Sequence, residues 1–192
     1  MKVMTEKEAQ RWCERAGISQ GRDYQLKFRR GGKHEFFIEA PEEHYKINAL
    51  AFALLCFRDK SLFSGGMLWL QRWDIGSPEL VKPGWCILES IRQTKGDIRS
   101  LEIAPAQHFR EDEFVELHAF LIQVIAYGWM ADFIPSLEYF VHFKTNRQVC
   151  FTATSSETLK DLRAAYHEWS PTDKDPMVVK LAAMEKVRKA KR

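Results

Sequence analysis

A segment that is apolar almost throughout, 111–128, constrains the fold of this chain more than any other feature. It opens with an acidic turn (111–113), which favours the positive end of a helix dipole. Within 117–129 the only strongly polar side chains are His118 and Gln123. A helix that is apolar nearly all round is buried in a core or in a membrane. The uninterrupted apolar stretches fall short of the roughly 20 residues that span a bilayer, so we expect the central core helix of a soluble domain.

Length and composition predict one globular domain. The chain has 192 residues, of which 45% are hydrophobic and 29% charged, which is typical of a folded protein with a sizeable core. The charge is uneven. Seven Lys/Arg and two acidic residues give residues 174–192 a local charge of +5, and the total of +3 therefore leaves −2 for the remainder. We predict a single domain over 1–170 and a basic C-terminal tail or helix over 171–192.

The distribution of cysteines and the first residues favour a cytoplasmic protein. The four cysteines are far apart and form no C-x-x-C pair, which argues against a structural zinc site. No apolar leader segment follows the first methionine. We therefore expect reduced, mostly buried thiols.

Regular patterns predict an α+β fold. Helical spacing covers about 6–16, 41–57, 78–95, 111–128 and 155–169, and extended patterns cover 24–28, 34–40, 67–73, 137–144 and 149–154. Thr5 and Glu8 fit a capping box for the first helix. Pro83 is expected to kink or split the third helix, and segment 98–109 is either a short strand or irregular. Two hairpins, 24–40 and 137–154, indicate a mostly antiparallel sheet covered by helices.

The run 67–73 is predicted to be a central strand of the sheet, because both of its faces carry large apolar groups. Alternation places one set of side chains on one face and a second set on the other. The first set is Met67, Trp69, Gln71 and Trp73, and the second is Leu68, Leu70 and Arg72.

Tryptophans provide the strongest candidate for a binding surface. The commoner interpretation of Trp69, Trp73, Trp85 and Trp129 is that they fill the core. In the functional interpretation, Trp73-Asp74 and Trp129 with Asp132 form the rim of an aromatic and acidic groove. Asp132 stands in an apolar context and is the least explained carboxylate of the chain; a carboxylate there more often caps a turn than takes part in chemistry.

Histidines offer a second kind of site. His118 lies on the apolar stripe of the 111–128 helix, where a buried neutral imidazole bonded to a carbonyl is the commoner case. A pocket between this helix and the 137–154 hairpin would instead use Asp132, His118 or His142 as acid–base groups. That hypothesis predicts side chains within about 3 Å of one another.

Motifs for known chemistries are missing from the sequence. It contains no glycine-rich nucleotide loop, no H-E-x-x-H spacing and no G-x-S-x-G elbow, and Cys150 is read as an inert core thiol. We therefore predict no catalytic set, no metal and no cofactor, and we lean away from an enzyme.

Three hypotheses for function follow. The first is a non-enzymatic protein-binding domain, adaptor-like or immunity-like, that uses the groove of Trp73, Asp74, Trp129 and Asp132. The alternative is a small ligand-binding protein or enzyme with a pocket near Asp132, His118 and His142. The third makes the basic tail a nucleic-acid tether. No membrane partner is expected, and nucleic acid is expected only at the tail.

Overall fold

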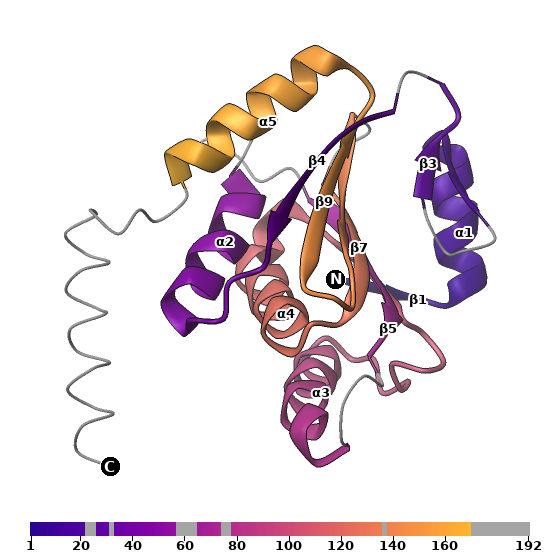
Figure 1. The fold of residues 1–192 in the computed structure, drawn as a ribbon. Coiled ribbons are helices and arrows are strands. Elements are labelled where there is room, and N and C mark those ends of the chain that lie inside the picture. Colours follow the sequence, from indigo (N-terminus) through magenta and orange to yellow (C-terminus); the bar gives the residue numbers. More distant parts are fainter. Residues whose placement is uncertain (22–25, 31–32, 57–64, 74–77, 136–137, 170–192) are drawn as a thin grey trace, which may run out of the picture.

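A computed structural model describes residues 1–21, 26–30, 33–56, 65–73, 78–135 and 138–169. Its architecture is α+β with antiparallel strand pairing, as predicted (Figure 1). The predicted basic tail, 171–192, lies outside the described residues and stays a prediction, as does the predicted domain boundary before it.

Seven strands form one antiparallel sheet in the order β1-β6-β5-β7-β8-β9-β4. In that order the strands are β1 (Lys2–Met4), β6 (Ala106–Phe109), β5 (Gly66–Arg72), β7 (Met130–Ile134), β8 (Tyr139–Phe143), β9 (Gln148–Ala153) and β4 (His34–Glu39). A separate two-stranded ribbon pairs β2 (Ile18–Gln20) with β3 (Leu26–Phe28).

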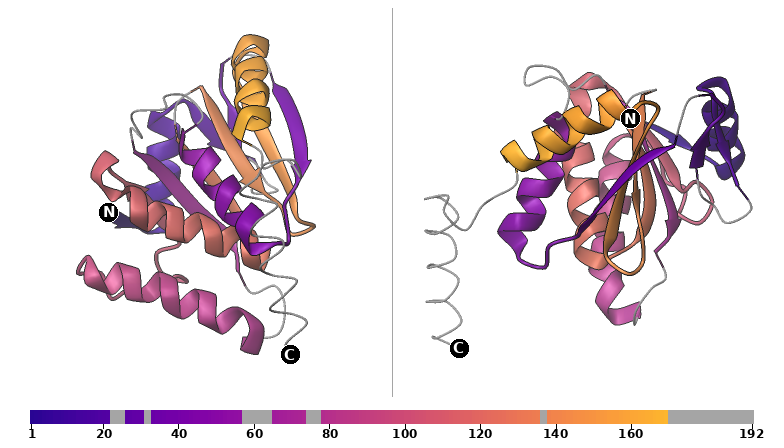
Figure 2. Two further views of the ribbon diagram at one scale, coloured as in Figure 1. Left: turned by 90° about the vertical axis from the view of Figure 1, so that its left-hand side faces the viewer. Right: turned by 45° about the horizontal axis from the view of Figure 1, so that its top comes forward.

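The helices form two unequal layers around this sheet. They are α1 (Glu6–Arg15), α2 (His44–Cys56), α3 (Pro78–Thr94), α4 (Phe114–Tyr127), which follows the short 3-10 turn η1 (Glu111–Glu113), and α5 (Ser156–Trp169). Helices α2, α3, α4 and α5 cover one face, and α1 covers the other together with the β2–β3 ribbon (Figures 1 and 2). Among the described helices, none is both long and apolar enough to cross a membrane.

The central core helix is confirmed in α4. Its five fully buried residues, Leu117, Phe120, Leu121, Val124 and Ile125, are each at most 1% exposed. The helix ends at Gly128, whose φ of 63° gives a left-handed C-cap, a conformation in which glycine avoids the penalty that a Cβ atom would bring. The helix α4 packs against both α2 and α3, which explains why nearly its whole circumference is apolar.

Side-chain alternation divides the sheet into two faces, each with its own core. On the helix-covered face, a row of mainly apolar residues crosses all seven strands: Val3, Gln107, Leu68, Phe133, Val141, Phe151 and Phe36. The matching row on the α1 face is Met4, Ala106, Trp69, Asp132, His142, Cys150 and Phe37. The prediction that 67–73 is a central strand is confirmed, because β5 is paired on both sides, with β6 and with β7.

Several local predictions need correction. The hairpin predicted over 24–40 is wrong, because β3 pairs with β2 and β4 pairs with β9; the hairpin 137–154 is confirmed as β8–β9. The ambiguous segment 98–109 contains strand β6. Helix α3 continues through Pro83 as one element, so Pro83 does not split it; the kink that was the other expectation stays a prediction. The short edge strand β1 and the strand β7 were not predicted.

Candidate functional site

A buried carboxylate and an imidazole meet across β7 and β8. Asp132 and His142 are directly opposite one another on these strands, and 2.8 Å separates Asp132 Oδ1 from His142 Nδ1. The Asp132 side chain is fully buried, whereas His142 keeps 12% of its side chain exposed. Because the carboxylate accepts this hydrogen bond, the proton is assigned to Nδ1 and the Nε2 atom of the neutral ring is an acceptor.

Gln71 holds the second oxygen of the carboxylate. Its Nε2 donates to Asp132 Oδ2 at 3.0 Å, and its Oε1 accepts from Gln20 Nε2 at 3.5 Å. Gln20 in turn accepts from Gln10 Nε2 of α1 at 3.3 Å. Side-chain amides thus connect α1 to Asp132 and satisfy a carboxylate that would be costly to bury without partners.

His142 also lines a pocket of about 240 Å³ on the α1 face of the sheet. Most of the wall comes from β4, β8 and β9, which lie next to one another at one end of the sheet. The polar or aromatic residues around His142 include Lys33, Glu35, Phe37, Lys144, Cys150 and Thr152. A pocket of this size is below the usual range for drug-sized ligands, so it fits a small molecule.

Glu35 contacts two other polar residues that line this pocket. Its Oε1 accepts from Thr152 Oγ1 at 3.2 Å and lies 3.0 Å from Lys33 Nζ. A second cation, Lys144 Nζ, donates to Gln148 Oε1 at 2.9 Å. Among the described residues, the lining beside His142 therefore combines two ammonium groups with one carboxylate.

Cys150 contributes a neutral thiol to this pocket. Burial raises the pKa of Cys150 to about 11, so the thiol form dominates at neutral pH. The thiolate is the nucleophilic form of cysteine, and burial disfavours that form of Cys150. This agrees with the interpretation of Cys150 as an inert thiol.

The arrangement is suited to proton transfer. A histidine whose Nδ1 is held by a carboxylate presents Nε2 as a base, and the protonated ring can return the proton as an acid. Within the described residues, Nε2 of His142 has no hydrogen-bond partner. The same part of the chain contains no group of three or more His, Cys, Asp or Glu that could hold a metal ion.

No protein-family model, curated protein or solved structure matches this chain. The functional inference below therefore depends on the geometry of the site alone.

The three described residues of the predicted groove, Trp73, Trp129 and Asp132, are separated in the structure. Trp129 is fully buried in the core under the helices, where it stacks on Tyr127 with ring centroids 5.3 Å apart. Asp132 is buried on the opposite face of the sheet. Asp74 lies outside the described residues. That these residues bind a partner stays a prediction, but Trp129 and Asp132 have no exposed surface in this conformation.

Trp73 lies on the opposite side of the sheet from the one that alternation predicted. The register between β5 and β7 shifts between Leu70 and Arg72, and such a bulge reorients the side chains that follow it. Trp73 consequently packs, half-buried, against the helix-side core and meets Trp85 edge-on at 5.9 Å.

The structure also separates the three residues of the predicted acid–base pocket. His142 and Asp132 come together, whereas His118 lies on α4 beneath the other face, with Nε2 3.5 Å from the Asn48 carbonyl oxygen. The position of Asp132 within β7 also corrects its expected role as a turn cap.

Sequence reasoning missed the second carboxylate partner, Gln71, and the pocket residues Glu35, Lys144 and Thr152. Gln71 was placed correctly on the Trp69 face, but nothing in the sequence gives the register that aligns it with Asp132. Glu35 and Thr152 are brought together by the β4–β9 pairing, which joins segments more than a hundred residues apart, and Lys144 follows β8, the other neighbour of β9.

Proposed function

We propose that this protein binds a small polar molecule in the pocket beside His142 and uses His142 as an acid–base group. The observation that carries the proposal is the fully buried Asp132 carboxylate, hydrogen-bonded to a histidine that lines a pocket. Buried charges are expensive and are retained mainly where they are paired and useful. This is the ligand-binding or enzymatic alternative from the sequence, with His118 left out.

The lining suggests a ligand with an anionic group. Lys33 and Lys144 provide positive charge, and the Phe37 ring lies 4.9 Å from Lys144 Nζ, where it forms an apolar side. A small carboxylate or phosphate ester that directs a protonatable group at His142 would use each of these features.

A thermal-shift screen of small carboxylates and phosphate esters tests this proposal. A compound that binds only the folded protein raises its melting temperature. We expect a compound from this panel to stabilise the native sequence, and we expect the stabilisation to be lost in His142→Gln and reduced in Lys144→Ala. Lys144→Ala leaves the buried pair intact, so it remains informative if His142→Gln folds poorly.

His118→Gln is the matched control, because it alters a histidine on the other side of the sheet. It should respond to the same compound as the native protein does. A compound that stabilises His142→Gln and Lys144→Ala as much as the native protein binds elsewhere. The proposal is contradicted if every compound that stabilises the native protein behaves in this way.

The protein-interaction function predicted first is our second candidate. Support comes from exposed apolar groups in the helical layer: Val115 on α4 is 74% exposed and Phe52 on α2 is 38% exposed. The Phe52 ring meets Phe114, the neighbour of Val115, at 5.8 Å. Isolated exposed apolar residues are ordinary, which is why this function ranks second. A stoichiometric association that survives Val115→Glu and Trp73→Ala would argue against these exposed residues as the interaction surface, and the absence of any association would argue against the function.

A further inference from the structure

A second pocket, of about 650 Å³, lies on the α1 face at the other end of the sheet. It is enclosed by α1 and by the neighbouring strands β1 and β6. Two strands, β5 and β7, separate β6 from β8, which carries His142. The two pockets are therefore independent in position, and this inference does not rest on the proposed function.

One side of α1 forms a wall of this second pocket. Glu8, Arg11, Trp12 and Arg15 line it, and their spacing of three and four residues places them on one helical face. The opposite side of the helix buries Ala9 and Cys13 against the sheet core. Together with Glu14, which also lines the pocket, α1 contributes an indole, two guanidinium groups and two carboxylates.

Strands β1 and β6 form the floor. Lys2 and His108 are directly opposite each other across these strands, and both line the pocket. The His108 ring lies 5.7 Å from the Trp12 ring, at an interplanar angle of 55°. Burial is the main cause that lowers the pKa of His108, followed by the Lys2 ammonium, so this aromatic floor is uncharged at neutral pH.

The charge of the lining is predominantly positive. Within the described residues, neither Lys2 nor Arg11 nor Arg15 forms an ion pair. Two carboxylates, Glu8 and Glu14, oppose these cations.

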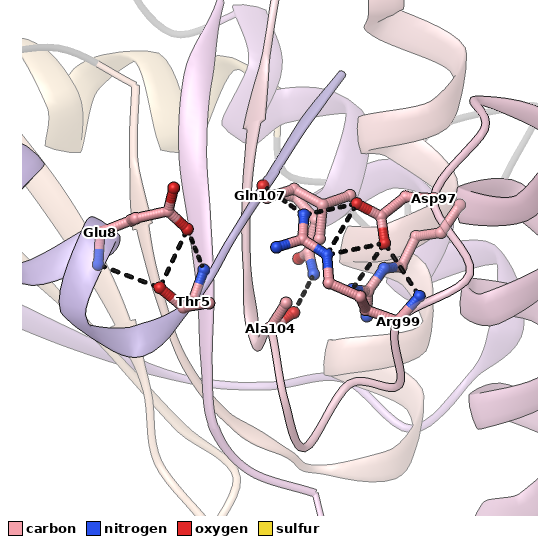
Figure 3. Close-up of polar contacts among 8 residues, drawn as sticks. Thr5, Glu8, Asp97, Arg99, Ala104 and Gln107 are labelled. Atoms are coloured by element: carbon pink, nitrogen blue, oxygen red, sulfur yellow. Dashed lines mark hydrogen bonds and ion pairs between the residues drawn. The ribbon is translucent and has the colours of Figure 1, made fainter.

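Glu8 is already engaged by the helix cap. Its Oε2 accepts from Thr5 N at 2.8 Å and from Thr5 Oγ1 at 2.9 Å (Figure 3). These hydrogen bonds hold the pKa of Glu8 below its usual value. The Glu8 carboxylate thus caps the N-terminus of α1 but stays ionised, so the described lining combines three cations with two carboxylates, a net charge of +1.

Proteins commonly bind nucleotides with an aromatic side chain and several cationic ones. The aromatic ring stacks on the nucleobase, and guanidinium groups pair with the phosphate oxygens. We propose that the pocket between α1 and β6 binds a nucleoside phosphate. Trp12 contacts the base, and Lys2, Arg11 and Arg15 surround the phosphate.

Calorimetric titration with adenosine monophosphate tests this site. We expect the full chain to bind it, and we expect the double variant Arg11→Ala/Arg15→Ala to bind about tenfold more weakly or worse, because each guanidinium contributes charged hydrogen bonds. Trp12→Leu should weaken binding of the nucleotide but leave the weaker binding of inorganic phosphate unchanged.

Lys160→Ala/Arg163→Ala is the matched control, since it removes two exposed cations from α5. It should bind the nucleotide as the native chain does. The proposal would be overturned by an absence of binding at millimolar nucleotide or by equal weakening in the α5 control.

Discussion

Asp132 Oδ1 lies 2.8 Å from His142 Nδ1 at the centre of a cross-strand row whose other members are apolar. Filling both positions with apolar residues would continue the row and avoid the cost of a buried charge. Both oxygens of the buried Asp132 carboxylate nevertheless accept a hydrogen bond, because Gln71 donates to Oδ2. The function proposed above is placed at this polar interruption of an otherwise apolar face.

The thiols should differ sharply in reactivity. Burial raises the pKa of Cys13 to about 12 and that of Cys150 to about 11, whereas Cys86 is exposed. We expect iodoacetamide at about pH 8 to label Cys86 in the folded protein and to spare the two buried thiols, as measured by peptide mass spectrometry. Equal labelling of Cys86 and Cys150 would show that the pocket is open to the reagent.

The same burial predicts a loss of stability in alkali. A thiol with an ordinary pKa of 9.0 ionises in the unfolded chain before Cys150 ionises in the folded one. Its contribution to the free energy of unfolding is therefore complete below pH 9 and is lost as the pH rises through about 11. Denaturant titrations should show a flatter pH dependence for Cys150→Ala, but not for Cys86→Ala. An unchanged slope in Cys150→Ala would contradict the burial.

Arg92 should be dispensable for stability. Its guanidinium is fully buried, its three nitrogens form no hydrogen bond with any described residue, and the nearest carboxylate oxygen, on Asp97, is 4.0 Å away. Burial accordingly lowers the pKa of Arg92. We expect Arg92→Met to leave the free energy of unfolding unchanged or to raise it by about 1–4 kcal/mol.

Arg99→Met is the comparison for Arg92, because Arg99 Nε donates to Asp97 and its Nη2 donates to the Val3 carbonyl oxygen at 3.0 Å (Figure 3). This variant should lower the free energy of unfolding, since it leaves the carbonyl of an edge strand without its partner. A larger loss in Arg92→Met than in Arg99→Met would mean that Arg92 has a partner that matters.

The close approach of α3 to the end of α4 gives another test. A Cβ atom at Gly84 would overlap the Tyr127 ring, which cannot move freely because it stacks on Trp129. We expect Gly84→Ala to cost about 1–3 kcal/mol by overpacking, despite the better helix propensity of alanine. In a double-mutant cycle, Tyr127→Leu should relieve most of that cost. Additive effects would contradict the contact.

The elements that could be predicted are those that depend on interactions between residues close together in the sequence. The capping box of Thr5 and Glu8 is formed as expected, and the apolar 111–128 segment is the central helix. These features depend on residues a few positions apart. The strand β7 was missed because it is buried on both faces and carries Asp132, so its sequence does not alternate. Strand β1 has three residues and exists only through its pairing with β6.

The site was predictable only in part. Asp132 was singled out because a carboxylate in an apolar run needs a partner, and His142 was among the candidates. Which histidine would meet it depends on the pairing of β7 with β8, and a shift of one residue in that register would turn His142 to the other face. The pocket forms only because β4 pairs with β9 and not with β3. This pairing depends on contacts between segments that are distant in the sequence.

The most direct measurement of the Asp132–His142 relationship is the imidazole nitrogen spectrum of ¹⁵N-labelled protein, recorded at a pH where the histidines are neutral. We expect His142 to carry its proton on Nδ1 and to show an unprotonated Nε2, since Asp132 accepts the hydrogen bond. In Asp132→Asn this tautomer preference should be reduced or reversed. A proton on Nε2 in the native protein, or a His142 spectrum that Asp132→Asn does not change, would contradict the assignment of His142 as the oriented acid–base group.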